Sequence, residues 1–103
     1  MHALQFLIVG KNEEILGTLK RLIENTNGWS ATISSEENEV LSYLENNPPD
    51  ALLVSSGLSE AFEKEIIQFV LHLNIKTKVI MHYGGGSGLL KNEIFSAFPH
   101  LAT

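Results

Sequence analysis

The chain has 103 residues, of which 44% are hydrophobic, with 12 acidic and 7 basic side chains and no cysteine. This size and composition predict a single compact domain over residues 1–103 and exclude a multidomain enzyme. The formal charge of −5 argues against nonspecific nucleic-acid binding, and the absence of cysteine excludes disulfide scaffolds, thiol catalysis and thiolate metal sites. We expect a cytoplasmic protein with neither signal peptide nor membrane span, because no cationic start precedes a long apolar run.

The first third of the chain alternates between apolar runs and an amphipathic pattern. Residues 5–10 read QFLIVG and predict a central strand buried on both faces. Asn12 offers an N-cap for a helix whose apolar side chains fall on one face and which Gly28 closes. Residues 29–33 alternate apolar and polar side chains, which predicts an edge strand with one exposed face.

The middle of the chain repeats this order. Ser34 and Glu37 have the spacing of a capping box and predict the start of a second short helix, which Pro48 and Pro49 end. Residues 51–54, with the sequence ALLV, form another continuous apolar run. They predict a second central strand.

Two further units complete the pattern. Ser59 is the predicted cap of a third helix, and residues 77–83 predict a fourth strand. A glycine-rich loop over residues 84–88 leads into a last helix over residues 89–98. Four βα units in succession predict an α/β fold, a three-layer sandwich in which helices cover both faces of a four-stranded parallel sheet.

The predicted fold says where chemistry should be sought. Ligands of open α/β sheets bind beyond the carboxyl ends of the strands. The loops that follow the strand ends are residues 10–12, 55–57 and 82–88. We expect these three loops to decide the function.

Three segments resemble the receiver (CheY-like) domains of two-component response regulators. They are LIVG with the KNEE that follows it, PDALLV before Ser55, and KVIMHY up to Tyr83. The resemblance covers nearly all of the chain. It implies a flavodoxin-like sheet of strand order 2-1-3-4 and a role in bacterial signal transduction.

The site residues of that family are replaced here. In receivers an acidic pair after the first strand holds Mg²⁺, an Asp after the third strand accepts the phosphoryl group, a Thr or Ser ends the fourth strand and a Lys ends the fifth. Gly10 and Lys11 match the acidic pair, Ser55 the phosphoacceptor and Tyr83 the hydroxyl residue, whereas the Lys has no counterpart. The resemblance therefore implies a degenerate receiver.

These replacements remove the chemistry that phosphoryl transfer needs. A divalent cation must offset the charge of the phosphoryl oxygens, and it prefers anionic oxygen ligands. Gly10 supplies no side-chain oxygen, Lys11 places a cation among the expected ligands, and Ser55 is a neutral hydroxyl. We predict a non-enzymatic pseudo-receiver that is not phosphorylated at this site and binds no metal or cofactor.

The alternative is a small flavodoxin-like protein that binds, or acts on, a phosphorylated small molecule. Bare amides at a helix start attract anions, although the glycine loop lacks the spacing of the known phosphate-binding motifs. An anion site would use Lys11, Asn12, Gly85, Gly86 and Ser87, and an enzyme would add Ser55 and His82. His82 has no carboxylate partner at a recognisable spacing, so a packed histidine is favoured over a general base.

The last expectation concerns the edge of the sheet. A complete receiver-like fold has a fifth strand and helix, and residues 99–103 alone follow the fourth helix. We expect the last βα unit to be missing or reduced to a stub. If residues 99–103 pair beside the fourth strand, they cover part of its edge; if they do not, residues 78–83 have an exposed apolar edge. The predicted partner is a protein, or a second copy in a homodimer, bound through the side of the fourth strand and fourth helix.

Overall fold

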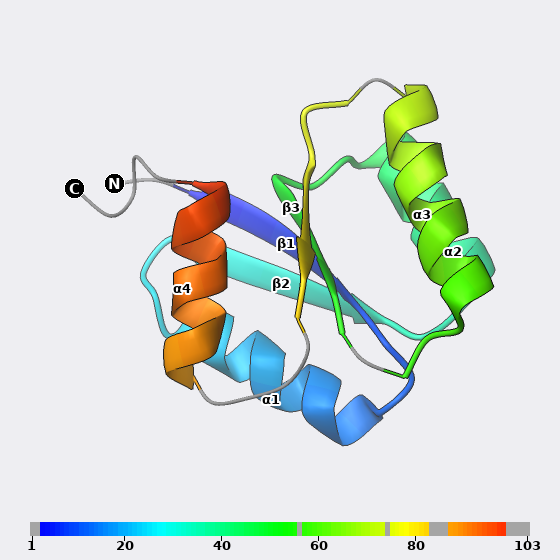
Figure 1. Cartoon of the computed structure of the whole chain (residues 1–103). Helices are drawn as coiled ribbons and strands as arrows, with labels where there is room; N and C mark the ends of the chain where they lie inside the picture. Colours follow the sequence, from blue (N-terminus) through cyan, green and yellow to red (C-terminus); the bar gives the residue numbers. More distant parts are fainter. Residues whose placement is uncertain (1–2, 56, 74, 83–86, 99–103) are drawn as a thin grey trace.

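Strands and helices alternate strictly along the chain, as predicted (Figure 1). The computed structural model describes residues 3–55, 57–73, 75–82 and 87–98. The elements are β1 (Leu4–Val9), α1 (Glu13–Glu24), β2 (Trp29–Ser34), α2 (Glu37–Asn46), β3 (Ala51–Val54), α3 (Glu60–Leu73), β4 (Lys78–Met81) and α4 (Ser87–Ala97). None of the helices in these ranges is long and apolar enough to cross a bilayer.

The strands form one parallel sheet of order β2-β1-β3-β4, which confirms the predicted topology. The two central strands are apolar because side chains on both of their faces meet a helix layer. All four residues of β3 are buried, and in β1 Gln5 alone is exposed. The sheet therefore separates two hydrophobic cores.

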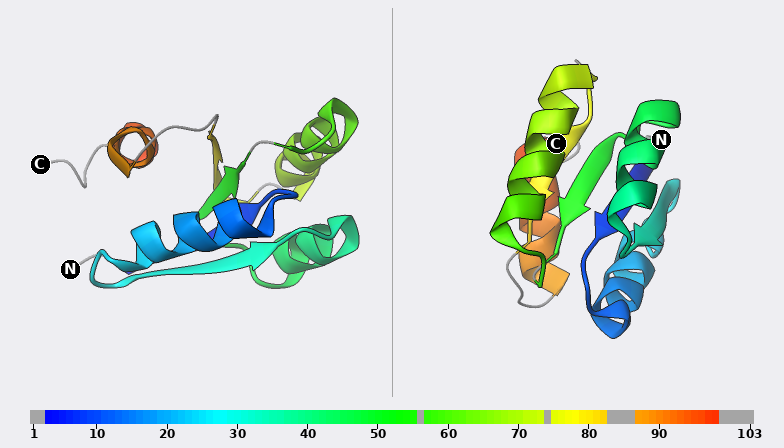
Figure 2. Two further views of the ribbon diagram at one scale, coloured as in Figure 1. Left: turned by 90° about the horizontal axis from the view of Figure 1, so that it is seen from below. Right: turned by 90° about the vertical axis from the view of Figure 1, so that its right-hand side faces the viewer.

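Each face of the sheet carries two helices (Figures 1 and 2). Alternate strand residues, among them Phe6, Ile8 and Leu53, pack in one cluster with side chains of α1 and α4. The residues between them, such as Leu7 and Leu52, pack in a second cluster with side chains of α2 and α3. Period-two alternation along the strands thus assigns each side chain to one core.

The face covered by α4 is not the one that continued winding would give. Crossovers between parallel strands are right-handed. The crossover from β1 to β2 runs in one direction along the sheet and places α1 on one face. The crossovers from β2 to β3 and from β3 to β4 run in the other direction and place α2 and α3 on the opposite face. A further crossover beyond β4 would put its helix beside α2 and α3. Leu90 and Ile94 of α4 instead pack in the α1 cluster. Helix α4 therefore covers the α1 face, and the stub expected over residues 99–103 lies outside the described residues.

Two predicted helix caps are confirmed and one is wrong. Asn12 accepts a hydrogen bond from the Ile15 amide at 3.1 Å, and Ser59 accepts one from the Phe62 amide at 3.1 Å. Ser34, however, is the last residue of β2 and caps no helix.

The failed cap has a local cause. The Ser34 carbonyl accepts the Gly10 amide, which keeps Ser34 in the sheet. The Ser34 hydroxyl lies 3.2 Å from the Glu39 carboxylate, so it hydrogen-bonds to Glu39 and not to Glu37, the partner that the capping-box spacing predicts. Helix α2 begins at Glu37 without a side-chain cap.

Candidate functional site

Three residues lie side by side at the carboxyl edge of the sheet. Gly10 follows β1, Ser55 follows β3 and His82 follows β4. The Ser55 amide donates to the Val9 carbonyl at 2.8 Å and the His82 amide to the Val54 carbonyl at 2.8 Å, so the strand register continues through this row. The alternation of side chains directs Ser55 and His82 to the α1/α4 face.

Gly10 is held in close contact with its neighbours. A β-carbon at this position would lie 3.0 Å from Cδ2 of Leu16 and 3.1 Å from Cβ of Ser55. Ser55 itself is 3% exposed. The position that carries a metal-binding carboxylate in receivers is therefore tightly packed, and even a single β-carbon here would require Leu16 and Ser55 to shift.

Lys11 is turned away from this row. Its Nζ donates to the Ser35 carbonyl at 3.0 Å, in the turn between β2 and α2. Gly57, with φ +97°, lies next to Lys11, because a β-carbon at Gly57 would be in van der Waals contact with Cβ of Lys11, at 3.5 Å. The amine is exposed but already bonded to backbone, and no group of three His, Asp or Glu residues in the described ranges could hold a metal ion.

His82 is a packed histidine, as expected, and the structure also gives it a carboxylate partner that the sequence did not reveal. His82 is 3% exposed, and its Nδ1 lies 2.5 Å from Oε1 of Glu93, which projects from α4. The partner has no recognisable spacing in the sequence, because its position depends on which face of the sheet α4 covers. A signal was present, since Glu93 adjoins the buried stripe of Leu90 and Ile94.

The order Ser55, His82, Glu93 has the form of a nucleophile, a base and a residue that orients the base. Such a relay needs a hydrogen bond between hydroxyl and imidazole. Among the residues that the structure describes, none joins Ser55 to His82, and both side chains are 3% exposed. The His82–Glu93 pair is therefore a buried polar contact that ties α4 to the end of β4.

The other predicted site residues do not converge on an anion site in the described part of the chain. The Asn12 side chain is occupied as the cap of α1. Ser87 is the first residue of α4. Tyr83, Gly85 and Gly86 lie outside the described residues.

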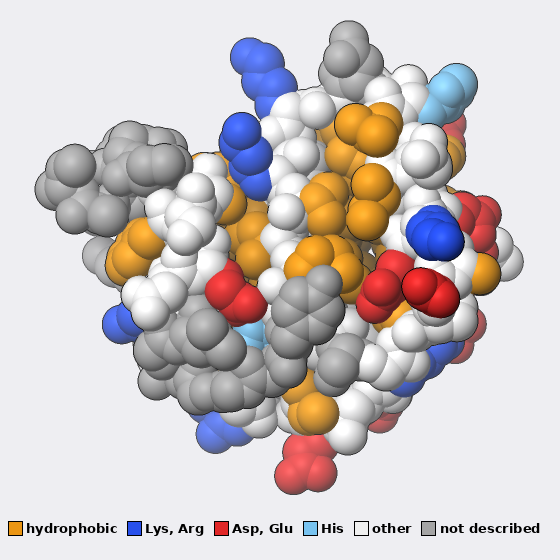
Figure 3. Space-filling view, in the orientation of Figure 1, with side chains coloured by type: hydrophobic (Ala, Val, Ile, Leu, Met, Phe, Trp, Pro, Cys, Tyr) orange, Lys and Arg blue, Asp and Glu red, His pale blue; other side chains and the backbone are white. Residues whose placement is uncertain are grey.

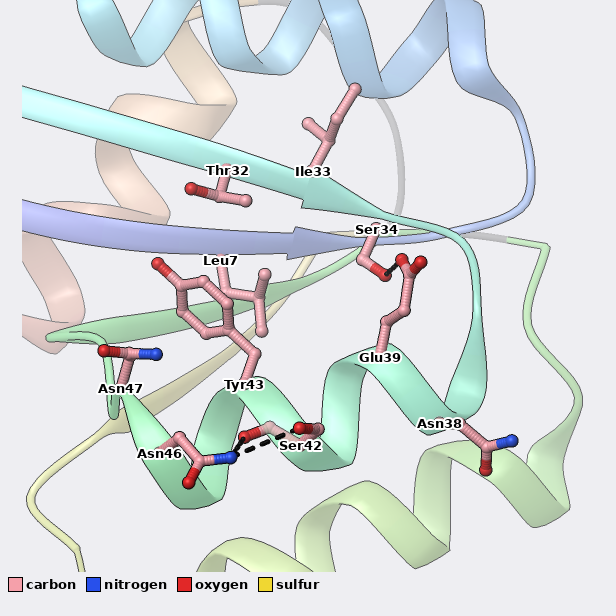
Figure 4. A pocket seen from close by; sticks show the side chains of 10 residues that line it. All are labelled: Leu7, Thr32, Ile33, Ser34, Asn38, Glu39, Ser42, Tyr43, Asn46 and Asn47. Atoms are coloured by element: carbon pink, nitrogen blue, oxygen red, sulfur yellow. Dashed lines mark hydrogen bonds between the residues drawn. The ribbon is translucent and has the colours of Figure 1, made fainter.

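A cavity lies elsewhere, between β2 and α2 (Figure 4). It has a volume of about 470 Å³ and is lined by apolar side chains, neutral polar groups and one carboxylate, without Lys, Arg or His. Several of its polar groups bond one another, namely Ser34 with Glu39 and Asn46 with Ser42. This lining contains no cation that could neutralise an anion.

Comparison with known proteins identifies the fold. The signal receiver domain of a protein assigned as a Luxo repressor of Vibrio parahaemolyticus superposes with a TM-score of 0.80 at 11% identity, over 96% of this chain and 92% of that one. A two-component response regulator of the LuxR family from Aurantimonas sp. SI85-9A1 gives a TM-score of 0.60 at 15% identity, over 93% and 69%. No protein-family model and no curated protein matches the sequence. The chain thus has the fold of receiver domains.

Proposed function

We propose that this chain is a pseudo-receiver, a signalling domain that acts through contact with protein and without phosphorylation at the receiver site. The receiver fold supports the signalling role. The observation that supports the absence of phosphorylation is the close packing of Gly10 against Ser55 and Leu16, because none of these three residues supplies a carboxylate at the end of β1 and β3. Such a domain needs no enzymatic activity and acts in the cytoplasm.

Charge at the site supports the same proposal. Acceptance of a phosphoryl group by a carboxylate depends on a divalent cation held by hard anionic oxygens. Here Gly10 and Lys11 follow β1 and Ser55 follows β3, so none of these positions carries a carboxylate that could hold such a cation. The bond of the Lys11 amine to the Ser35 carbonyl also leaves it poorly placed to bind a phosphorylated small molecule, so the alternative function has less support.

The test is incubation of the chain with Mg²⁺ and a small phosphodonor, followed by intact-mass measurement. We expect no phosphoryl adduct. The Ser55→Asp variant should also remain unmodified, because Gly10 and Lys11 still replace the acidic pair that holds the cation; its far-UV circular dichroism reports whether it folds. A Mg²⁺-dependent phosphoryl adduct on Ser55 of the unaltered chain, located by peptide mass mapping, would overturn the proposal.

A further inference from the structure

We propose that the outer edge of β4 pairs with the β4 edge of a second copy of this chain, in antiparallel orientation, so that two four-stranded sheets become one continuous sheet. The inference rests on the proposed function in that it names the protein that the domain contacts. Three features of this edge support it: its hydrogen-bonding groups, its apolar side chains and its charges.

The two edges of the sheet differ in their hydrogen bonding. On β2, the outward amides of Trp29 and Ala31 are satisfied by the Thr26 carbonyl at 3.1 Å and the Glu24 carboxylate at 3.2 Å. A free β-edge is a template for another strand, and such caps block it. The outer edge of β2 is therefore closed over much of its length.

The edge of β4 has no such caps in the described part of the chain. The amides of Lys78 and His82 donate to β3, so by alternation the amides and carbonyls of Val79 and Met81 point outward. Within the described ranges no group bonds to them. An antiparallel copy centred on Ile80 places Val79 opposite Met81 of the second copy, in the arrangement where the two residues exchange both N–H···O bonds.

Apolar side chains lie along the same edge. Val79 and Met81 are only partly buried and face the α2/α3 side, where Phe69, Leu73 and Ile75 are also partly buried. Figure 3 looks onto this edge and shows hydrophobic side chains gathered between β4 and α3. Pairing of two copies would bring these strips together and remove them from water.

The charges make this edge complementary to itself. Lys76 and Lys78 stand at the start of β4, whereas Glu93 lies beside its end at His82. Antiparallel pairing about Ile80 sets Lys78 of one copy next to the end of β4, and hence the Glu93 side, of the other. A surface with opposite charges at its two ends fits a second copy related by a two-fold axis, which argues for self-pairing.

Proline gives a selective test. Val79→Pro removes an outward amide and leaves the hydrogen bonds to β3 intact, so the fold should persist. We expect light scattering after size exclusion to show a dimer of the unaltered chain, and Val79→Pro to raise its dissociation constant on the order of tenfold or more. Ile33→Pro is the matched control, since it alters an outward amide of β2, and should leave the dimer unchanged.

Two further measurements keep the test decisive. Met81→Lys puts a cation in the apolar strip without altering the backbone and should likewise favour the monomer. Amide exchange at Val79 and Met81 should slow as protein concentration rises. A chain that is monomeric at all concentrations, or a dimer that survives both β4 variants, overturns the pairing.

These outcomes are separable from those of the proposed function. An unphosphorylated monomer would overturn the pairing and leave the pseudo-receiver proposal standing. A dimer that is phosphorylated at Ser55 would do the reverse.

Discussion

Gly10 occupies a position where the absence of a side chain is a packing requirement. A β-carbon at this position would lie 3.0 Å from Cδ2 of Leu16 and 3.1 Å from Cβ of Ser55, so Gly10→Ala should force both neighbours to move. We expect it to lower the free energy of unfolding by about 1–3 kcal/mol, as overpacking does in other cores. Urea unfolding measures the change.

Gly17 provides the matched control for this prediction. It lies within α1, and a β-carbon at this position would have no atom within 4 Å. Gly17→Ala should raise the free energy of unfolding by roughly 0.5–1 kcal/mol, because alanine is the better helix former. Equal effects of the two substitutions would contradict the packing argument at Gly10.

A second prediction at the level of single residues concerns the His82–Glu93 pair. Glu93→Ala leaves a 3% exposed imidazole without its carboxylate, and a buried polar group that loses its partner costs about 1–3 kcal/mol. We expect that loss of stability and faster amide exchange throughout α4. Lys91→Ala, on the exposed side of the same helix, should change neither. Unchanged exchange in α4 after loss of Glu93 would show that the pair does not fasten the helix.

At the scale of elements, α2 and α3 meet through two like charges. Glu65 lies at the surface, where a side-chain hydrogen bond with Glu37 and the repulsion of its charge raise the pKa of Glu65. The folded chain therefore binds this proton more tightly than the unfolded chain. Stability from this group is present at acid pH and is lost as the pH rises through the raised pKa.

Glu37→Gln should remove that repulsion. We expect the urea midpoint of this variant to exceed that of the unaltered chain at neutral pH and to match it in acid, where the carboxyls are protonated. Glu45→Gln, elsewhere on α2, should show no comparable pH-dependent difference. A gain for Glu37→Gln that is the same at both pH values would exclude like-charge repulsion as its cause.

The elements also show what the sequence could and could not predict. Apolar runs predicted both central strands, and Asn12 and Ser59 predicted two helix starts, since these signals are local. The face covered by α4 depends on tertiary packing, and with it the partner of His82. The predicted cap at Ser34 was wrong for a similar reason. The backbone hydrogen bond of Ser34 in the sheet determines its conformation, and the local spacing to Glu37 does not.

At the scale of the whole molecule, the central strands belong to both cores. Leu44 lies in the α2/α3 cluster and Ile94 in the α1/α4 cluster, each at most 1% exposed. Changing either residue to Ala should lower the free energy of unfolding by about 2–5 kcal/mol. Because one sheet joins the two cores, we expect both variants still to unfold in a single step.

The fluorescence of Trp29 can show whether the two cores unfold in a single step. Trp29 packs with Phe6 and Phe95, at ring-centroid distances of 5.4 and 6.5 Å, and so reports on the α1/α4 core. Its fluorescence should follow the same urea curve as far-UV circular dichroism in the Leu44→Ala variant. Separate transitions would mean that the two faces unfold independently.

The Glu24 carboxylate on the Ala31 amide has a consequence for the number of copies that can join. A sheet with two open edges can add copies without end and grow into a fibre. Because a side chain of the same chain occupies the β2 edge, further copies can add only at the β4 edge. When two β4 edges pair, neither copy has an open edge left. One acidic side chain at the end of α1 would thus limit assembly to pairs and keep the protein from polymerising.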